Sequence, residues 1–252
     1  MKILSIYNMK GGVGKTATAV NLSHLAARSG HRTLLCDFDP QGAATYYLRI
    51  EPDAELKARK LLKGKTFAHQ QVKESDFQLL DVLPAHLEFR NFDLFLDQEK
   101  KSRKRLGKLL RSFAEEYDLL VIDAPPNITL LSENIFHASD LLLIPVIPTT
   151  LSLRTYAQIR DFFRSSGLDF SKTRGFFSMV DRRKNLHCQT IQSTLAEKPF
   201  FLPAQIPLAS VVEQMGPQRL PLAEYAPRSP SVGAYRDLLE STLAVLGILP
   251  VS

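Results

Sequence analysis

Apolar runs alternate with helically spaced segments along most of this chain. The runs are nearly continuous, a pattern typical of strands that are covered on both faces. They fall at Lys2–Tyr7, Thr33–Cys36, Gln78–Leu83, Leu119–Ile122, Leu141–Val146 and Gly175–Val180, with a weaker run at Phe200–Ile206. Helical spacing predicts helices that include Thr16–Arg28, Lys101–Glu115, Thr155–Ser165 and Tyr235–Leu246. Strands separated by helices form βαβ units, so we predict an α/β fold with a mostly parallel, twisted sheet and helices on both faces.

Two less regular segments bear on the domain organisation. Residues Glu51–Lys73 and the proline-rich Ala209–Pro230 lack clear periodicity, and we interpret both as surface excursions. A chain of 252 residues could form one large α/β domain or two small ones. No internal repeat or low-complexity tract is present, and we expect a single domain over residues 1–252.

Composition places the protein among soluble globular chains. Apolar residues make up 44% of it, and no apolar run reaches the roughly 18 residues of a transmembrane helix. The sequence enters a strand pattern at once, so we expect no signal peptide. Cys36 and Cys188 form no metal-binding pattern, which fits a reduced cytoplasm. The net charge of +6 and the pI near 9.3 favour an acidic partner such as nucleic acid or anionic lipid.

The segment Met9-Lys10-Gly11-Gly12-Val13-Gly14-Lys15-Thr16 lies between the first predicted strand and the first predicted helix. A glycine-rich turn in this position presents backbone N–H groups to a phosphate chain at the positive end of the helix dipole. Lys15 can reach the β- and γ-phosphates, and the Thr16 hydroxyl can bind Mg²⁺. We therefore predict a fold of the P-loop NTPase type. The segment departs from the strict pattern at Met9, where glycine is usual, and it carries a second lysine, Lys10.

Carboxylates end two further predicted strands. Asp37 and Asp39 follow Leu34-Leu35-Cys36, and Asp123 follows Leu119–Ile122 and precedes Pro125-Pro126. The carboxyl ends of strands in a parallel sheet face the ligand crevice. Asp39 could therefore orient an attacking water or hold a Mg²⁺-bound water, and Asp123 could hold the Mg²⁺ shell.

These three segments, in this order and spacing, resemble the deviant Walker A ATPases of the ParA/MinD family. The segment Asp37-Phe-Asp39-Pro-Gln-Gly42 is similar to the ParA (Soj-like) branch. Further similarity covers nearly the whole chain, at Ala138–Val146, Ser178–Asn185, Ile206-Pro207 and Ser231–Arg236.

The resemblance implies roles for individual residues. Lys10 matches the signature lysine that crosses a dimer interface to the partner's nucleotide, where it would act like an arginine finger. Lys15 is implied in ATP binding and catalysis, and Asp39 in water activation. Gly11, Gly12, Val13, Gly14, Thr16 and Ala17 complete the implied phosphate loop. Thr16, Asp37 and Asp123 are implied near Mg²⁺, and Met179 and Pro207 lie where adenine-flanking segments fall. Ala17 and Ala124 depart from the residues usual at their positions.

The same resemblance implies partners: a homodimer formed on ATP, DNA bound without sequence preference, and a ParB-like or adaptor protein that stimulates hydrolysis. We expect the protein to be cytoplasmic and associated with the nucleoid. Two basic clusters are candidates for DNA contact, Lys100–Arg111 and Arg182-Arg183-Lys184. The first could equally be a solvated helix face with Leu106, Leu109 and Leu110 turned inward. Residues Leu208 to Val212 lack the arginine that the family often has after its Ile-Pro pair.

Two other functions stay open at this level. A P-loop transferase or ligase would use ATP on a small metabolite, although the Asp-Pro-Gln-Gly segment argues against it. A MinD-like ATPase would bind a membrane through a basic amphipathic C-terminal helix, but residues Ala244 to Ser252 contain no lysine or arginine, so no membrane contact is expected. The cargo could be a chromosome, a plasmid, a chemoreceptor cluster, a microcompartment, or a secretion or cellulose-synthesis apparatus.

Overall fold

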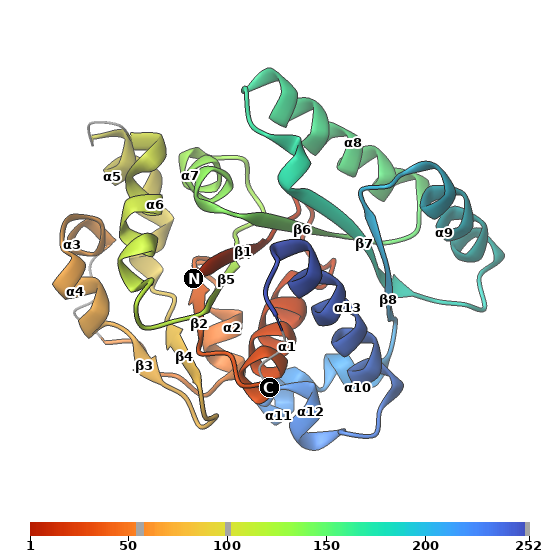
Figure 1. The fold of residues 1–252 in the computed structure, drawn as a ribbon, viewed down its shortest axis with the longest axis horizontal. Coiled ribbons are helices and arrows are strands. Elements are labelled where there is room, and N and C mark those ends of the chain that lie inside the picture. Colours follow the sequence, from red (N-terminus) through yellow and green to blue (C-terminus); the bar gives the residue numbers. More distant parts are fainter. Residues whose placement is uncertain (54–57, 99–101, 250–252) are drawn as a thin grey trace.

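One sheet of eight strands forms the centre of the computed structural model, which describes residues 1–53, 58–98 and 102–249 (Figure 1). The strand order is β3-β4-β2-β5-β1-β6-β7-β8. All neighbouring pairs are parallel except β3 with β4, which confirms the predicted fold class. The expectation of a single domain stays a prediction, and the continuity of this sheet supports it.

The strands are β1 (Lys2–Ile6), β2 (Thr33–Asp37), β3 (Lys73–Glu74), β4 (Leu80–Leu83), β5 (Leu119–Asp123), β6 (Leu141–Val146), β7 (Thr173–Val180) and β8 (Phe201–Pro207). The α-helices are α1 (Lys15–Arg28), α2 (Ala43–Tyr47), α3 (Ala58–Lys63), α4 (Lys65–Gln70), α5 (Phe92–Asp97), α6 (Arg105–Leu110), α7 (Leu130–Ala138), α8 (Thr150–Ser165), α9 (Asn185–Glu197), α10 (Ser210–Glu213), α11 (Met215–Gln218), α12 (Leu222–Tyr225) and α13 (Pro230–Leu246). Short 3₁₀ helices are η1 (Leu87–Asn91), η2 (Ser102–Lys104), η3 (Arg111–Phe113) and η4 (Phe170–Lys172).

Each face of the sheet has its own hydrophobic core. In β1, Ile3 packs into one core, while its neighbours along the strand, Leu4 and Ile6, pack into the other. The first core contains side chains from α3, α5, α6, α7 and α8, and the second contains side chains from α1, α11, α12 and α13. Figure 1 shows these two helical layers above and below the strands. Strands β2, β5 and β6 are buried along their whole length, so both of their faces had to be apolar.

Two predicted helices begin earlier than their apolar spacing indicates. Helix α8 starts at Thr150 and is capped by Thr149, whose side chain accepts a hydrogen bond from the Ser152 N–H. Helix α13 starts at Pro230, with Ser229 capping it. Polar caps and a first-turn proline carry no apolar periodicity, so a pattern of buried positions does not detect them.

The helix predicted over Lys101–Glu115 is wrong as a single element. Lys101 lies outside the described residues, and the remainder is divided among η2, α6 and η3. The backbone N–H of Leu106 donates to the side chain of Asn134 on α7 at 3.2 Å. A Cβ at Gly107 would lie 3.5 Å from the Cβ of Ala138, so the glycine lets α6 and α7 pack closely. Contacts with α7 therefore determine this segment more strongly than its own periodicity does.

The two supposed surface excursions also contribute to the core. Apart from 54–57, which lie outside the described part, Glu51–Lys73 contains α3 and α4, whose Ala58, Leu61 and Ala68 are fully buried. Within Ala209–Pro230, Met215 and Leu222 are fully buried against α1 and α13. Each of these helices has six residues or fewer, too short to show a clear period.

Candidate functional site

The glycine-rich loop joins β1 to α1 at the carboxyl edge of the sheet. Gly12 and Gly14 have φ angles of +69° and +89°, which side chains rarely adopt. A Cβ on Gly14 would lie 2.9 Å from the Ser178 Oγ, so this position also lacks space for one. Asn8 holds the loop in place: its Nδ2 donates to the Pro145 carbonyl of β6 at 2.7 Å, and its Oδ1 accepts from the Lys10 N–H at 2.9 Å.

The first turn of α1 is open to an anion. Gly14 occupies the N-cap position in a left-handed conformation, and no side chain caps the helix. The first N–H groups of a helix have no partner within it, and here they carry the positive end of the dipole of a 14-residue helix. A phosphate is the kind of group that satisfies both the hydrogen bonds and the charge.

Lys15 is held at the base of this loop. Its side chain is largely buried, and Nζ donates to the Lys10 carbonyl at 3.1 Å. Burial lowers the pKa of Lys15, while the negative charges of Asp123 and Asp39 act in the opposite direction. The ammonium therefore lies between the glycine loop and the carboxylates, where it can meet a phosphate chain.

Asp37 and Asp123 are partners across the β2–β5 pair, at the carboxyl ends of both strands. Both are fully buried. Asp37 is well bonded: its Oδ2 accepts from the Thr45 N–H at 2.9 Å and from the Thr45 hydroxyl at 2.8 Å. Burial raises the pKa of Asp37 to about 6, against the effect of these hydrogen bonds.

Asp123 is in the opposite situation. Neither of its oxygens has a well-formed hydrogen bond to another described residue. Burial, followed by the charge of Asp37, raises its pKa well above the ordinary value, while the nearby Thr16 hydroxyl and Lys15 favour the charged form. A buried carboxylate without hydrogen bonds costs free energy unless a cation or donor completes it.

One cavity of about 440 Å³ opens onto the glycine loop, while the buried Asp37 and Asp123 lie outside its lining. The loop residues Gly11, Gly12, Gly14, Lys15, Thr16 and Ala17 line it together with Asp39, Met179 and Pro207. Among the other lining residues, sequence reasoning did not assign Tyr47, Ser178, Val212, Glu213 and Tyr235 to the site. Those five come from α2, β7, α10 and α13. Ser178 and Tyr235 lie in segments similar to the family, whereas no local motif marks the other three. Val13 is buried beneath the loop instead of lining the cavity.

Asp39 stands at the mouth of this cavity, half-buried. Its Oδ1 accepts from the Gln41 N–H at 3.0 Å, which orients the side chain after β2 has ended. Its negative charge acts on Lys15, Asp37 and Asp123. Asp39 is thus the accessible carboxylate of the three, and it can bond a water that has entered the cavity.

The donor set fits Mg²⁺ only together with a phosphate. In the described part of the chain, no three Asp, Glu, His or Cys side chains converge to hold a metal ion. Mg²⁺ typically takes one or two carboxylates and completes its shell with waters and phosphate oxygens. The unpartnered oxygens of Asp123 and the neighbouring Thr16 hydroxyl fit that role. The oxygens of Asp37 are engaged by Thr45 and by the Asp39 N–H, so a direct contact with metal would have to displace these bonds.

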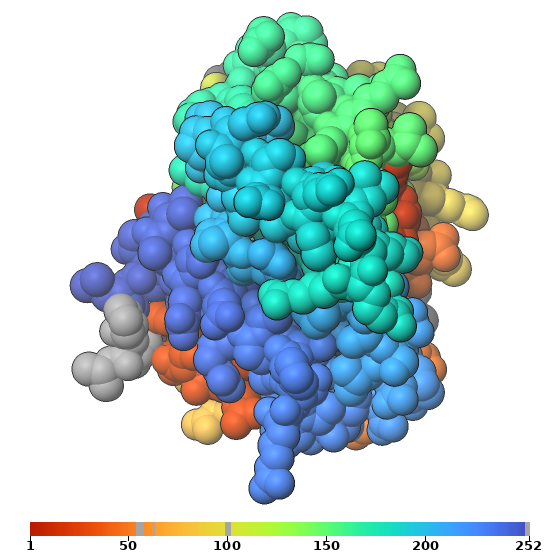
Figure 2. Space-filling view, turned by 90° about the vertical axis from the view of Figure 1, so that its right-hand side faces the viewer, coloured from red at the N-terminus to blue at the C-terminus, as the bar shows by residue number. Residues whose placement is uncertain are grey.

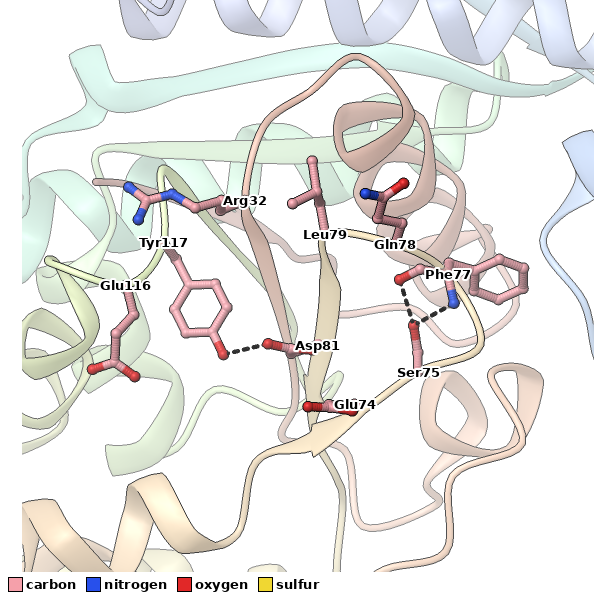
Figure 3. A pocket seen from close by; sticks show the side chains of 9 residues that line it. All are labelled: Arg32, Glu74, Ser75, Phe77, Gln78, Leu79, Asp81, Glu116 and Tyr117. Carbon is pink, nitrogen blue, oxygen red and sulfur yellow. Dashed lines mark hydrogen bonds between the residues drawn. The ribbon is translucent and has the colours of Figure 1, made fainter.

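A second cavity, of about 480 Å³, lies at the opposite, amino edge of the sheet (Figure 3). Residues before or at the starts of β2, β4 and β5 line it, among them Arg32, Leu79 and Tyr117. The Tyr117 hydroxyl donates to Asp81 at 2.7 Å, as the dashed line in Figure 3 shows. This cavity contains neither a glycine loop nor the start of a long helix, so the phosphate chemistry belongs to the carboxyl edge.

Both basic clusters are partly neutralised, and they differ in their place in the fold. Lys100 and Lys101 lie outside the described residues. Elsewhere in the first cluster, Arg103 pairs with Glu133 at 3.0 Å and Arg111 with Asp140 at 2.8 Å, while Leu106, Leu109 and Leu110 are buried. In the second cluster, Arg183 pairs with Asp181 at 2.9 Å, and Arg182 and Lys184 are exposed without an ion pair to the described residues. The second cluster follows β7 and so lies at the same edge as the cavity of the glycine loop.

Comparison with known proteins decides the family. A family model described as "AAA domain" matches residues 1–166. Sporulation initiation inhibitor protein Soj of Bacillus subtilis (strain 168) is 32% identical over 252 residues, which cover 96% of this chain and 98% of Soj. This chain belongs to the ParA/MinD family of deviant Walker A ATPases, in its Soj-like branch. The resemblance seen in its motifs is thereby confirmed.

Solved structures agree with this ParA/MinD fold. A putative plasmid partition protein of Borrelia burgdorferi bound to AMPPNP superposes with a TM-score of 0.83 at 22% identity, covering 96% of this chain and 98% of that one. Cobyrinic acid a,c-diamide synthase of Mycobacterium smegmatis with ADP and magnesium gives 0.80 at 22% identity, covering 98% and 96%. Both likenesses show the fold alone, because partition proteins and metabolite synthases share it.

The unpartnered Asp123 yields a prediction about stability. Its pKa is raised in the folded state, so its contribution to stability is present below the unfolded pKa and is lost as the pH rises through the folded value. Asp123→Asn should therefore raise the melting temperature of the nucleotide-free protein at pH 7, by about 2 °C or more, and this gain should vanish near pH 4. Thermal melts across that pH range measure it. The exposed Asp161→Asn is the matched control, and an unchanged or lower melting temperature for Asp123→Asn at pH 7 would contradict the assignment.

Proposed function

We propose that this protein is a ParA-type positioning ATPase that dimerises on ATP, binds DNA without sequence preference and releases it after partner-stimulated hydrolysis. A single observation carries the proposal: the cavity of the glycine loop combines an uncapped helix start, a buried Lys15 and the accessible Asp39, and the unpartnered Asp123 lies near Lys15 and Thr16. Its relatives include proteins named as a chromosome-partitioning ATPase and a chromosome partitioning protein. A ParB-like or adaptor protein is the proposed stimulator, and the cytoplasmic nucleoid is the proposed location.

Each group in or near the cavity has a chemical role in the proposed reaction. The N–H groups of residues Gly11 to Ala17 and the Lys15 ammonium would hold the phosphate chain. Ala17 offers only its backbone there. Thr16 and Asp123 would hold Mg²⁺, which would supply positive charge to the phosphate chain. Asp39 would orient the attacking water. Met179 and Pro207, on the far side of the same cavity, would flank the adenine.

Lys10 is the group in the loop that is free to act outside its own subunit. Its backbone is fixed, because the N–H donates to Asn8 and the carbonyl accepts from Lys15. Its ammonium, by contrast, makes no ion pair within the described chain, and the side chain is half-exposed. A cation on a rigid loop that faces solvent can reach a nucleotide held by a second subunit.

Exposed apolar side chains at the carboxyl edge of the sheet support the proposed dimer. Ile128, Leu151, Leu186 and Leu208 follow β5, β6, β7 and β8 respectively, and each is between 38% and 67% exposed. All four therefore lie at the carboxyl edge, around the cavity of the glycine loop. Large apolar side chains gathered at one edge are typical of a surface that a partner covers.

Lys10→Ala tests the role across the dimer. Without this cation, charge that develops during phosphoryl transfer is less neutralised, so turnover should fall about 10-fold or more while ATP affinity changes by less than about 3-fold. Steady-state hydrolysis and nucleotide titration measure the two effects. Lys2→Ala, at the opposite edge of the sheet, is the matched control. Normal turnover in Lys10→Ala would exclude the proposed role.

Asp39→Ala tests the activation of water. The variant keeps the phosphate loop and Asp123, so it should bind ATP and dimerise but hydrolyse it at least about 100-fold more slowly. Size-exclusion chromatography with light scattering should then show a dimer that persists for hours after ATP addition. Dissociation at the wild-type rate would contradict the assignment, with Asp161→Ala as the control.

Charge reversal distinguishes the two DNA-binding candidates. Arg182→Glu with Lys184→Glu should abolish the ATP-dependent gel shift of random-sequence DNA, because both side chains are exposed at the carboxyl edge and form no ion pair with the described residues. Lys104→Glu with Lys108→Glu, in the first cluster, makes the same change in net charge and should retain the shift. If the two double variants behave in the opposite way, the first cluster is the DNA-binding site; no shift for wild-type protein at low salt would reject DNA binding itself.

A further inference from the structure

A third cavity, of about 350 Å³, lies at the amino edge of the sheet between the ends of α8 and α9. We call it the α8–α9 cavity. Its lining residues are Tyr156, Arg160, Arg164, Phe170, Glu197, Lys198, Pro199 and Phe200. Phe170 and Phe200 shortly precede β7 and β8, whereas the glycine loop follows β1, so the two cavities lie at opposite edges of the sheet. Figure 2 shows the β8 end of the molecule, where the second half of the chain, teal to blue, covers most of the visible surface.

Helical spacing brings three of its residues onto one face. Tyr156, Arg160 and Arg164 are four residues apart on α8, so their side chains follow one another along the helix. Tyr156 is buried and forms the floor, with ring centroids 4.8 Å from Phe201 and 5.9 Å from Phe170. The two arginines extend outward from this floor and are exposed.

The cations of the α8–α9 cavity are poorly neutralised. Arg160 approaches Asp161 only to 3.8 Å, and Lys198 approaches the exposed Glu197 only to 4.0 Å. Arg164 has no ion pair with a residue in the described ranges. Burial raises the pKa of Tyr156 to about 12, and a hydrogen bond with Thr173 and the charges of Arg160 and Arg174 oppose that rise. The cavity therefore carries an excess of positive charge that an anion would balance.

Flat apolar surface accompanies this charge. Phe200 is 39% exposed although it is a large apolar side chain, and its ring lies 5.9 Å from that of Phe170. The guanidinium of Arg174 lies over the Phe200 ring, 5.4 Å from its centre. Arginine and phenylalanine side chains both stack on planar rings, and paired guanidinium groups bind phosphate. Cavities of about this size hold small ligands.

We propose that the α8–α9 cavity binds a nucleotide, with its phosphate on Arg160, Arg164 and Lys198 and its base against Phe200 and Phe170. This site is separate from the ATP site, and the proposal does not depend on the function assigned to the glycine loop. The ligand class follows from the combination: a phosphate alone would leave the aromatic surface uncovered, and an aromatic compound alone would leave the cations unbalanced.

The test uses three small probes that share parts of a nucleotide. UMP carries the base, the ribose and the phosphate. Uridine lacks the phosphate, and ribose 5-phosphate lacks the base. Calorimetric titration of the full chain should show UMP binding more tightly than either fragment. Arg160→Ala with Arg164→Ala should weaken UMP binding about 10-fold or more. Phe200→Ala should weaken UMP but leave ribose 5-phosphate unchanged.

Two controls keep the result specific. Arg154→Ala removes a cation from another side of α8 and should leave UMP binding unchanged. Amide NMR shifts on UMP addition should fall in residues 197–201. The proposal is overturned if UMP does not bind, if the Arg154 and double-arginine variants behave alike, or if the shifts fall only in residues 11–14. Melting curves check folding, and Arg164→Glu, an exposed substitution, replaces any variant that does not fold.

Discussion

The site depends on two carboxylates that are buried side by side at the ends of neighbouring strands, because the groups around them must offset the cost of burying both. Asp37 and Asp123 are strand partners and both are fully buried. Burial raises the pKa of each, and the charge of Asp37 raises the pKa of Asp123 further. A fold tolerates such a pair only where donors and cations surround it. Thr45 supplies the donors for Asp37, and Lys15 supplies a cation near Asp123. The two oxygens of Asp123 still lack a hydrogen-bond partner. A metal ion bound together with phosphate could satisfy them.

The loop above these carboxylates is rigid for related reasons. Asn8 ties it to β6, and Gly14 packs so closely against Ser178 of β7 that a side chain would not fit. Lys15 is bonded to the loop's own carbonyl at Lys10. Contacts with β6 and β7 therefore hold the loop in place, and the loop sequence alone contains only part of the site. The side chain of Lys10 is the exception, since it faces solvent while its backbone is fixed.

The same parallel sheet provides two chemically different edges. At the carboxyl edge, helix starts point their dipoles at the cavity and exposed leucines surround it. At the amino edge, α8 and α9 end instead of beginning, so the site there relies on side-chain cations and rings rather than on backbone N–H groups. Helices α8 and α9 begin after β6 and β7 at the carboxyl edge and end at the amino edge.

The sequence by itself determined the α/β class, seven of the eight strands within two residues, the phosphate loop and the three aspartates. These features are local: continuous apolar runs, glycines with a lysine, and acids at strand ends are readable without knowing what lies beside them. Tertiary structure decided the rest. It divided the segment 101–115 because Gly107 packs against α7, and it buried the short helices of both irregular segments. It separated the bonded Asp37 from the unpartnered Asp123, which look alike in sequence. It also assembled both cavities from distant segments. Tyr47 and Tyr235 meet at the cavity of the glycine loop, and the ends of α8 and α9 meet at the α8–α9 cavity, since only packing sets such distances.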